Sequence, residues 1–188
     1  MAIALHPRPR TVVIPPGAVL WRVHSRGYGP VHFGREPTGR FNAPAGEFGV
    51  WYAGASPAVS VLEVLVRNAS DRAVEQSALN ARVLSSLVVQ QELRLFQFEG
   101  PGLAHLGVGA ERAHAEPYGE CQQLALDTWS AHPWMDGIQY RSRWDTSQIC
   151  YAIFDRAAAK IGRARGTQLL SDVAVWAPLL DPYEISVL

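Results

Sequence analysis

The chain has 188 residues and carries 17 Lys and Arg against 17 Asp and Glu, so its formal net charge is zero. With 48% hydrophobic and 18% charged residues it has the composition of a globular domain, and the neutral balance argues against a protein that binds nucleic acid backbones. The two cysteines, Cys121 and Cys150, form no CxxC pair, so we expect neither disulfides nor a metal site. No run approaches the roughly 18 apolar residues of a membrane span. We therefore expect one cytoplasmic domain over residues 1–188 without membrane contact.

The first third of the chain predicts two strands joined by a long loop. Residues 19–24 (VLWRVH) follow a Pro-Pro-Gly breaker and are typical of a strand. Residues 25–45 are rich in Gly and Pro, and a loop of this length in a compact domain is usually functional or mobile. Residues 48–53 predict the second strand.

A helix is predicted from Ser56–Pro57 to about Arg67. Serine is a good N-cap, and proline suits the first helical position because its missing N–H has no partner there anyway. The apolar spacing predicts that the core-facing residues are Ala58, Val61, Leu62 and Leu65.

The rest of the chain predicts further strands at 82–90, 93–98, 138–142 and 149–154, and a helix at 118–130 after Pro117. Residues 155–188 show little periodicity, and we expect a final strand near the C-terminus. Because strands and helices mix without regular βαβ alternation, the predicted class is α+β.

Several catalytic motifs are absent from the sequence. It contains no GxGxxG after a strand, no Walker lysine loop, no HExxH and no GxSxG. Hydride transfer, phosphoryl transfer on a P-loop and zinc proteolysis therefore have no support.

What remains is a set of polar residues beside the ends of the predicted elements: Arg22, Arg40, Tyr52, Glu63 and Ser142. Each has an ordinary structural interpretation when taken alone. The two arginines could face solvent, Tyr52 could pack in the core, and Ser142 could sit in a turn. Glu63 could pair with Arg67 on an exposed helix face, which would be worth only about 0.3–0.5 kcal/mol.

The order of the segments favours a functional interpretation. The chain contains, in this order, LWRVH (20–24), FG (33–34), GRFN (39–42), GVWYAG (49–54), AVSVLEVL (58–65), DGIQYRS (136–142) and ICYAIFD (149–155). This set, with a Tyr eleven residues before the Glu of the following helix, resembles the RES domain, a family named for its arginine, glutamate and serine. The resemblance spans about residues 20–155, and no motif is matched at 67–82 or after 155.

The resemblance implies a fold and an activity. RES proteins resemble ADP-ribosyltransferases, so we expect a compact domain with a mixed β-sheet core and flanking helices. They act on NAD by phosphorolysis or hydrolysis, or by transfer of ADP-ribose to a protein. They are typically toxins paired with a helix-turn-helix (Xre) antitoxin that covers the active site. By resemblance, Arg22 and Arg40 are the motif arginines, and Tyr52, Glu63 and Ser142 are the motif tyrosine, glutamate and serine.

The residue types suit cleavage of the nicotinamide–ribose bond. An arginine fork such as that of Arg40 binds a pyrophosphate, and Tyr52 can stack on the cationic nicotinamide. Glu63 would stabilise positive charge on the ribose, with Arg22 and Tyr52 completing the catalytic set, while Ser142 would hydrogen-bond the substrate. NAD is then a substrate, phosphate is one alternative acceptor, and no metal is needed. Two alternatives stay open: a mono-ADP-ribosyltransferase with a protein target, and a non-catalytic nucleotide-binding module that regulates a partner.

Overall fold

The computed structural model describes residues 3–66 and 72–188. Its main element is a mixed sheet of eight strands in the order β1-β6-β7-β8-β3-β2-β5-β9. Neighbouring strands are antiparallel except β6 and β7, which are parallel. The strands are β1 (Thr11–Ile14), β2 (Val19–Ser25), β3 (Val50–Gly54), β5 (Arg82–Val89), β6 (Leu93–Phe98), β7 (Gly137–Arg141), β8 (Ile149–Phe154) and β9 (Ile161–Leu169).

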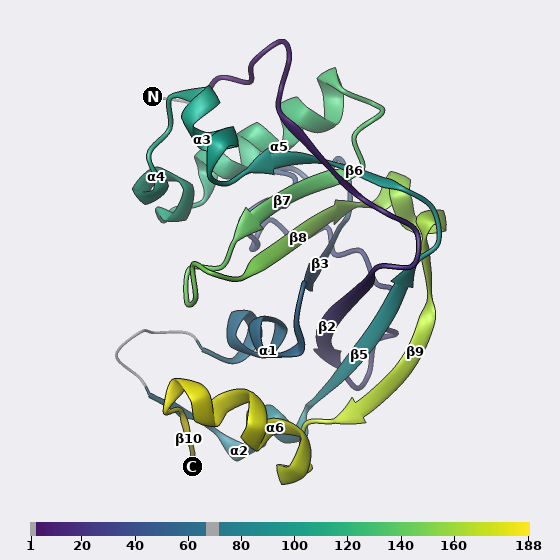
Figure 1. Cartoon of the computed structure of the whole chain (residues 1–188), viewed down its shortest axis with the longest axis vertical. Coiled ribbons are helices and arrows are strands. Elements are labelled where there is room, and N and C mark those ends of the chain that lie inside the picture. Colours follow the sequence, from purple (N-terminus) through teal and green to yellow (C-terminus); the bar gives the residue numbers. More distant parts are fainter. Residues whose placement is uncertain (1–2, 67–71) are drawn as a thin grey trace.

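Helices gather at both ends of this curled sheet (Figure 1). Beside β6 and β7 lie α3 (Pro101–Leu106), α4 (Ala110–His114) and α5 (Gly119–Ala131). In the lower half of Figure 1, α1 (Pro57–Leu65) packs on the central strands β2 and β3, and α2 (Gln76–Asn80) and α6 (Val173–Leu180) lie below it with the short parallel pair β4 (Ala73–Val74) and β10 (Ser186–Val187). Two 3-10 helices, Asp155–Lys160 and Asp181–Tyr183, complete the described elements.

Hydrophobic clusters cover both faces of the sheet, as the side chains of β3 illustrate. These side chains alternate between two hydrophobic clusters, as the period of a strand requires. Val50 belongs to a cluster that includes residues of α5, and Tyr52 packs against it from the same face. Trp51 and Ala53 belong to a second cluster with β5 and β6. A third cluster joins α1 to α2 and α6.

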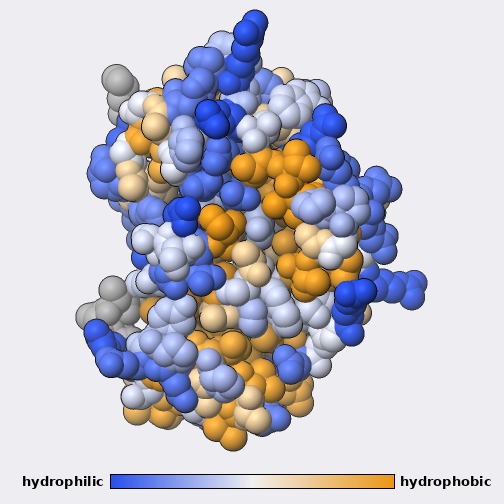
Figure 2. Space-filling model, in the orientation of Figure 1, coloured by the Kyte–Doolittle hydropathy of each residue, from blue (hydrophilic) through white to orange (hydrophobic). Residues whose placement is uncertain are grey.

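The C-terminal end exposes apolar side chains. In Figure 2, hydrophobic residues gather at the lower end of the molecule, over the region of α6, and Val173 and Leu188 are 59% and 72% exposed. Across residues 3–66 and 72–188, no helix is long and apolar enough to cross a membrane.

The expected α+β class with a mixed sheet and flanking helices is confirmed. Most predicted elements appear within two residues of their expected bounds. The expected final strand near the C-terminus is the two-residue β10, and the long β9 precedes it without having been predicted separately. The helix starts at Pro57 as expected and ends at Leu65; Arg67, and with it the considered Glu63–Arg67 pair, lies outside the described residues.

The predicted core face of α1 is only partly right. Val61 and Leu62 are buried, but Ala58 and Leu65 are half-buried, whereas Val59 and Ser60 are buried instead. The reason is that α1 packs against the sheet as well as against α6, so its buried face is rotated from a simple apolar stripe.

Candidate functional site

The start of α1 is held closely against the sheet. The Ser56 hydroxyl oxygen accepts a hydrogen bond from the Val59 N–H at 3.3 Å, which makes Ser56 the N-cap that the sequence predicted. The Ser60 hydroxyl lies 2.9 Å from the Trp21 carbonyl oxygen of β2. A Cβ at Gly54 would lie 2.5 Å from side-chain atoms of Val59 and Ser60, so only glycine allows β3 to pass this close. These contacts fix where α1 presents Glu63.

The Glu63 carboxylate is oriented by two donors from the segment after β7. Its Oε1 atom accepts hydrogen bonds from the Ser142 hydroxyl at 2.6 Å and from the Arg143 N–H at 3.3 Å. The Ser142 oxygen accepts in turn from the N–H groups of Trp144 and Asp145, at 3.1 and 3.3 Å. Because these donors occupy the lone pairs of the Ser142 oxygen, its own proton is directed at Glu63.

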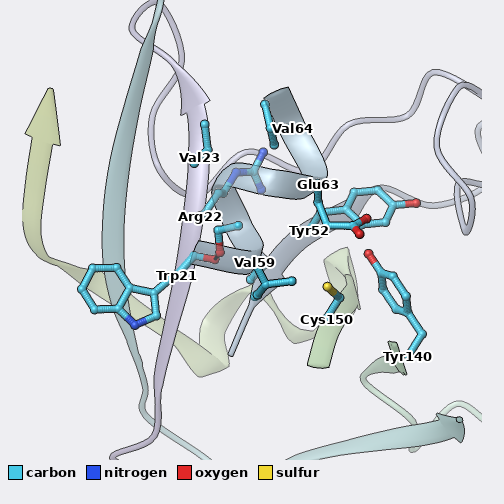
Figure 3. Close-up of a pocket in the computed structure, with 12 residues that line it drawn as sticks. Trp21, Arg22, Val23, Tyr52, Val59, Glu63, Val64, Tyr140 and Cys150 are labelled. Atoms are coloured by element: carbon cyan, nitrogen blue, oxygen red, sulfur yellow. Dashed lines mark hydrogen bonds between the residues drawn. The ribbon is translucent and has the colours of Figure 1, made fainter. Parts of the chain in front are cut away.

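Glu63 lies where two hollows meet. The first hollow is lined by residues that include Trp21, Arg22, Val59 and Cys150, and the second by residues that include Thr38, Arg40, Tyr118 and Arg143. Both are lined by Tyr52, Glu63, Val64 and Tyr140, so they are two parts of one cleft. Figure 3 shows the first part, with the Tyr140 hydroxyl directed toward the Glu63 carboxylate.

Arg22 brings an unpaired guanidinium to the first hollow. Its Nε and Nη1 atoms are buried and have no hydrogen-bond partner among the described residues, and the group lies 5.6 Å from the centroid of the Trp51 ring. Burial lowers the pKa of Arg22 to about 10, so the side chain remains charged at neutral pH. The interpretation of Arg22 as a solvent-facing strand arginine is therefore wrong. Buried donors of this kind are rarely left unpaired, and their position beside a hollow indicates an anionic or hydrogen-bonding ligand.

Arg40 is the corresponding cation of the second hollow. Only 7% of the residue is exposed, so it is not the solvated loop arginine considered from the sequence. Its guanidinium carbon lies 5.1 Å from the Tyr140 ring centroid and 5.9 Å from that of Tyr118. Within the described part of the chain it makes no hydrogen bond or ion pair. Aromatic rings hold the group in place while its donors stay available.

Tyr52 supports the long loop. Its hydroxyl donates to the Asn42 side-chain oxygen and accepts from the Phe41 N–H, both at 2.8 Å. Burial raises the pKa of Tyr52 above its usual value of 10, so the phenol stays protonated. A Cβ at Gly39 would lie 2.7 Å from the Tyr52 hydroxyl, so this side of the loop depends on glycine. The hydroxyl is therefore committed to the fold, while the residue lines both hollows.

The described residues include no group of three or more His, Cys, Asp or Glu side chains placed to hold a metal ion.

Comparison with known proteins identifies the family. The RES domain family model matches residues 19–172, a span that contains all five candidate residues. The chain belongs to the RES-domain family. Among solved structures, a chain of the crystal structure of the M. tuberculosis MbcT–MbcA toxin–antitoxin complex is similar, with a TM-score of 0.72 and 16% identity over 90% of this chain and 92% of that chain. At this identity the likeness shows a shared fold. No curated protein matches.

Four of the five candidate residues from the sequence line this one cleft of the RES domain: Arg22, Arg40, Tyr52 and Glu63. Part of the long loop, including Thr38 and Gly39, walls its second hollow. The two arginines lie in different hollows.

Ser142 has a different place from the one expected. Direct contact with a substrate was predicted, but Ser142 is fully buried, lines neither hollow and directs its hydroxyl at Glu63. Its position in this RES domain is that of a residue that orients the carboxylate.

Tyr140 and Arg143 also line the cleft, although the sequence did not single them out. Burial raises the pKa of Tyr140 well above its usual value, so its hydroxyl keeps its proton beside Glu63. A signal for Tyr140 was present: it precedes Ser142 by two residues on an extended segment, where side chains two apart share a face.

Proposed function

We propose that this RES-domain protein is a toxin that cleaves the bond between nicotinamide and ribose in NAD, by phosphorolysis or hydrolysis. The observation that carries the proposal is the position of Glu63. Its carboxylate is fixed by Ser142 and lies where the two hollows meet. Each hollow is lined by an arginine that has unpaired donors. Within the described chain, Arg22 has no hydrogen-bond partner at Nε and Nη1, and Arg40 has no hydrogen-bond partner at all.

A fixed carboxylate suits the bond that breaks. Nicotinamide leaves as a neutral molecule, so the leaving group needs little acid catalysis. The ribose carbon passes through an oxocarbenium-like state, and positive charge develops where an oriented carboxylate can stabilise it. Glu63 needs no reorganisation at that moment, because Ser142 and the Arg143 N–H already hold it.

The walls of the cleft suit the rest of NAD. A pyrophosphate requires permanently charged, planar donors, which Arg22 and Arg40 supply. The rings of Tyr52 and Tyr140 offer flat aromatic surfaces to the cationic nicotinamide. We therefore propose that Arg40 binds the pyrophosphate and that Arg22 does so from the first hollow, in which Glu63 and Tyr52 act on the nicotinamide–ribose bond, with Ser142 as the residue that positions Glu63.

The toxin role and the partner are proposed from family membership together with the similar fold of a chain in a toxin–antitoxin complex. The proposed partner is a helix-turn-helix (Xre) antitoxin. Expression of this chain alone should arrest growth and lower cellular NAD, and co-expression of the neighbouring reading frame should restore both. Normal growth and unchanged NAD with soluble, folded protein would contradict the toxin role.

Product analysis tests the reaction itself. Purified protein is incubated with labelled NAD, with and without phosphate, and with a protein extract as potential acceptor. Free ADP-ribose indicates hydrolysis, its phosphate ester indicates phosphorolysis, and label on protein indicates an ADP-ribosyltransferase. Binding of NAD without any product would indicate the non-catalytic module instead. Glu63→Gln protein serves as the control for contaminating activity.

A further inference from the structure

An ion pair stands at the rim of the second hollow. The Arg143 Nη1 atom lies 2.6 Å from the Glu116 Oε1 atom, and the Tyr118 hydroxyl donates to the same oxygen at 2.8 Å. The two partners differ in exposure: the Arg143 side chain is 28% exposed and that of Glu116 is 61% exposed. Arg143 and Tyr118 line the hollow, whereas Glu116 is not among its lining residues.

Arg143 and Arg40 both contribute positive charge to the second hollow. Both line the second hollow. The pKa of His114 is lowered by burial and also by the positive charges of Arg40 and Arg143, in keeping with the wall that the two arginines share. The pKa of Glu116 is lowered chiefly by its hydrogen bonds from Arg143 and Tyr118, with a smaller contribution from Arg40. Glu116 therefore partly neutralises two arginines at once.

The other carboxylate beside this hollow is Glu63, on the wall shared with the first hollow. The negative charge of Glu63 repels an anion that lies close to that wall. An anion in the second hollow is thus directed toward the opposite side, where Arg40, Arg143 and Tyr118 lie.

Resting on the proposed function, we propose that Arg40 and Arg143 form a subsite for a phosphate group, and that Glu116 occupies Arg143 until that phosphate group displaces it. An exposed carboxylate paired with arginine contributes little free energy, whereas a phosphate offers more negative charge and can accept two parallel hydrogen bonds from a guanidinium. The phosphate group belongs either to the pyrophosphate of NAD or to inorganic phosphate as acceptor.

Binding of inorganic pyrophosphate and inorganic phosphate, measured by titration calorimetry on the full chain, tests the exchange. Arg143→Gln removes a charge-assisted hydrogen bond and should weaken binding of the probe about tenfold or more. Glu116→Gln removes the internal competitor and should strengthen binding about two- to fivefold. In the double variant, Glu116→Gln should have a smaller effect than in the wild type, because only its weaker interaction with Arg40 remains.

A matched control is available in another surface ion pair. Glu92 pairs with Arg94 at 2.8 Å and lines neither hollow, so Glu92→Gln should bind the probes as the wild type does. Thermal melting checks that each variant is folded. If Arg143→Gln does not fold, Arg143→Lys, which keeps the charge but loses the planar fork, should still weaken binding.

The outcomes separate the inference from the proposed function. Unchanged binding in folded Arg143→Gln protein overturns the subsite, and weaker binding in Glu116→Gln protein overturns the exchange, because Glu116 would then hold Arg143 in place for the ligand. A raised KM for NAD in Arg143→Gln protein assigns the subsite to the pyrophosphate, and a raised KM for phosphate alone assigns it to the acceptor. If wild-type protein leaves NAD intact but binds the probes through Arg143, the proposed function fails and the subsite stands.

Discussion

Replacement of Glu63 by glutamine isolates the charge of the carboxylate. Glutamine has nearly the same volume, and its carbonyl oxygen can accept the same hydrogen bonds from the Ser142 hydroxyl and the Arg143 N–H. The variant should therefore fold as the wild type does and retain the shape of the cleft.

The expected loss of turnover follows from the distance over which the charge acts. A unit charge about 4 Å from the ribose carbon, at an effective dielectric constant near 20, interacts with a full positive charge by about 4 kcal/mol. If this interaction is present only in the transition state, it corresponds to about three orders of magnitude in rate. Since the charge on the ribose is only partly developed and Glu63 is half-buried, we expect a loss of at least about two orders of magnitude.

The assay is release of nicotinamide from NAD, with kcat and KM determined separately. The loss should appear in kcat, because the missing interaction belongs to the transition state. Glu92→Gln is the matched control for loss of one carboxylate elsewhere on the surface. Turnover within tenfold of the wild type, in Glu63→Gln protein with a normal melting curve, would remove Glu63 from the mechanism.

Four further outcomes are expected. Ser142→Ala should lower kcat about tenfold with little change in KM, because Glu63 loses a hydrogen bond that orients it; steady-state kinetics check this. Arg22→Met should weaken NAD binding yet raise the melting midpoint by about 2 °C or more, because it removes buried donors without partners; calorimetry measures both. Tyr52→Phe loses two buried hydrogen bonds of the hydroxyl and should reduce the free energy of unfolding by about 1–3 kcal/mol in denaturant titrations. In the folded protein the pKa of His114 lies below its ordinary value of 6.5, so the unfolded chain binds more protons near that pH. The free energy of unfolding should therefore fall as the pH drops through 6.5, and it should fall less in His114→Gln protein. Denaturant titrations at about pH 7.5 and about pH 5.5 test the sign of this change.

Elements with strong local signals could be predicted from the sequence. The N-cap and proline before α1 are local features, and the structure confirms both. By contrast, β1 and β9 carry weak signals, because each is an edge strand with many exposed residues. Their formation depends on partners distant in the sequence, β6 for the first and β5 for the second.

The site could be predicted as a set of residues but not as a set of contacts. Glu63 and Ser142 are 79 residues apart and meet only because β7 pairs with β8, which pairs with β3. No sequence pattern tells which way the Ser142 hydroxyl points, which is why it was expected to contact the substrate. Arg22 posed a related problem: both faces of the sheet around β2 are covered, so alternation along the strand did not indicate whether its side chain was buried.

The unpaired arginines connect stability to function. Arg22 holds buried donors without partners, and the Arg40 guanidinium has no ion pair in the described chain, so an anion that enters the cleft satisfies groups that the fold leaves unsatisfied. A ligand at about 100 times its Kd would stabilise the protein by about 2.7 kcal/mol. A carboxylate from an inhibitory partner chain could occupy the same arginines, so we expect substrate and partner to exclude one another. Each should then raise the melting midpoint when bound alone. With both at about 100 times their Kd, the gain over either one alone should be only about 0.4 kcal/mol, whereas independent sites would add a second gain of about 2.7 kcal/mol.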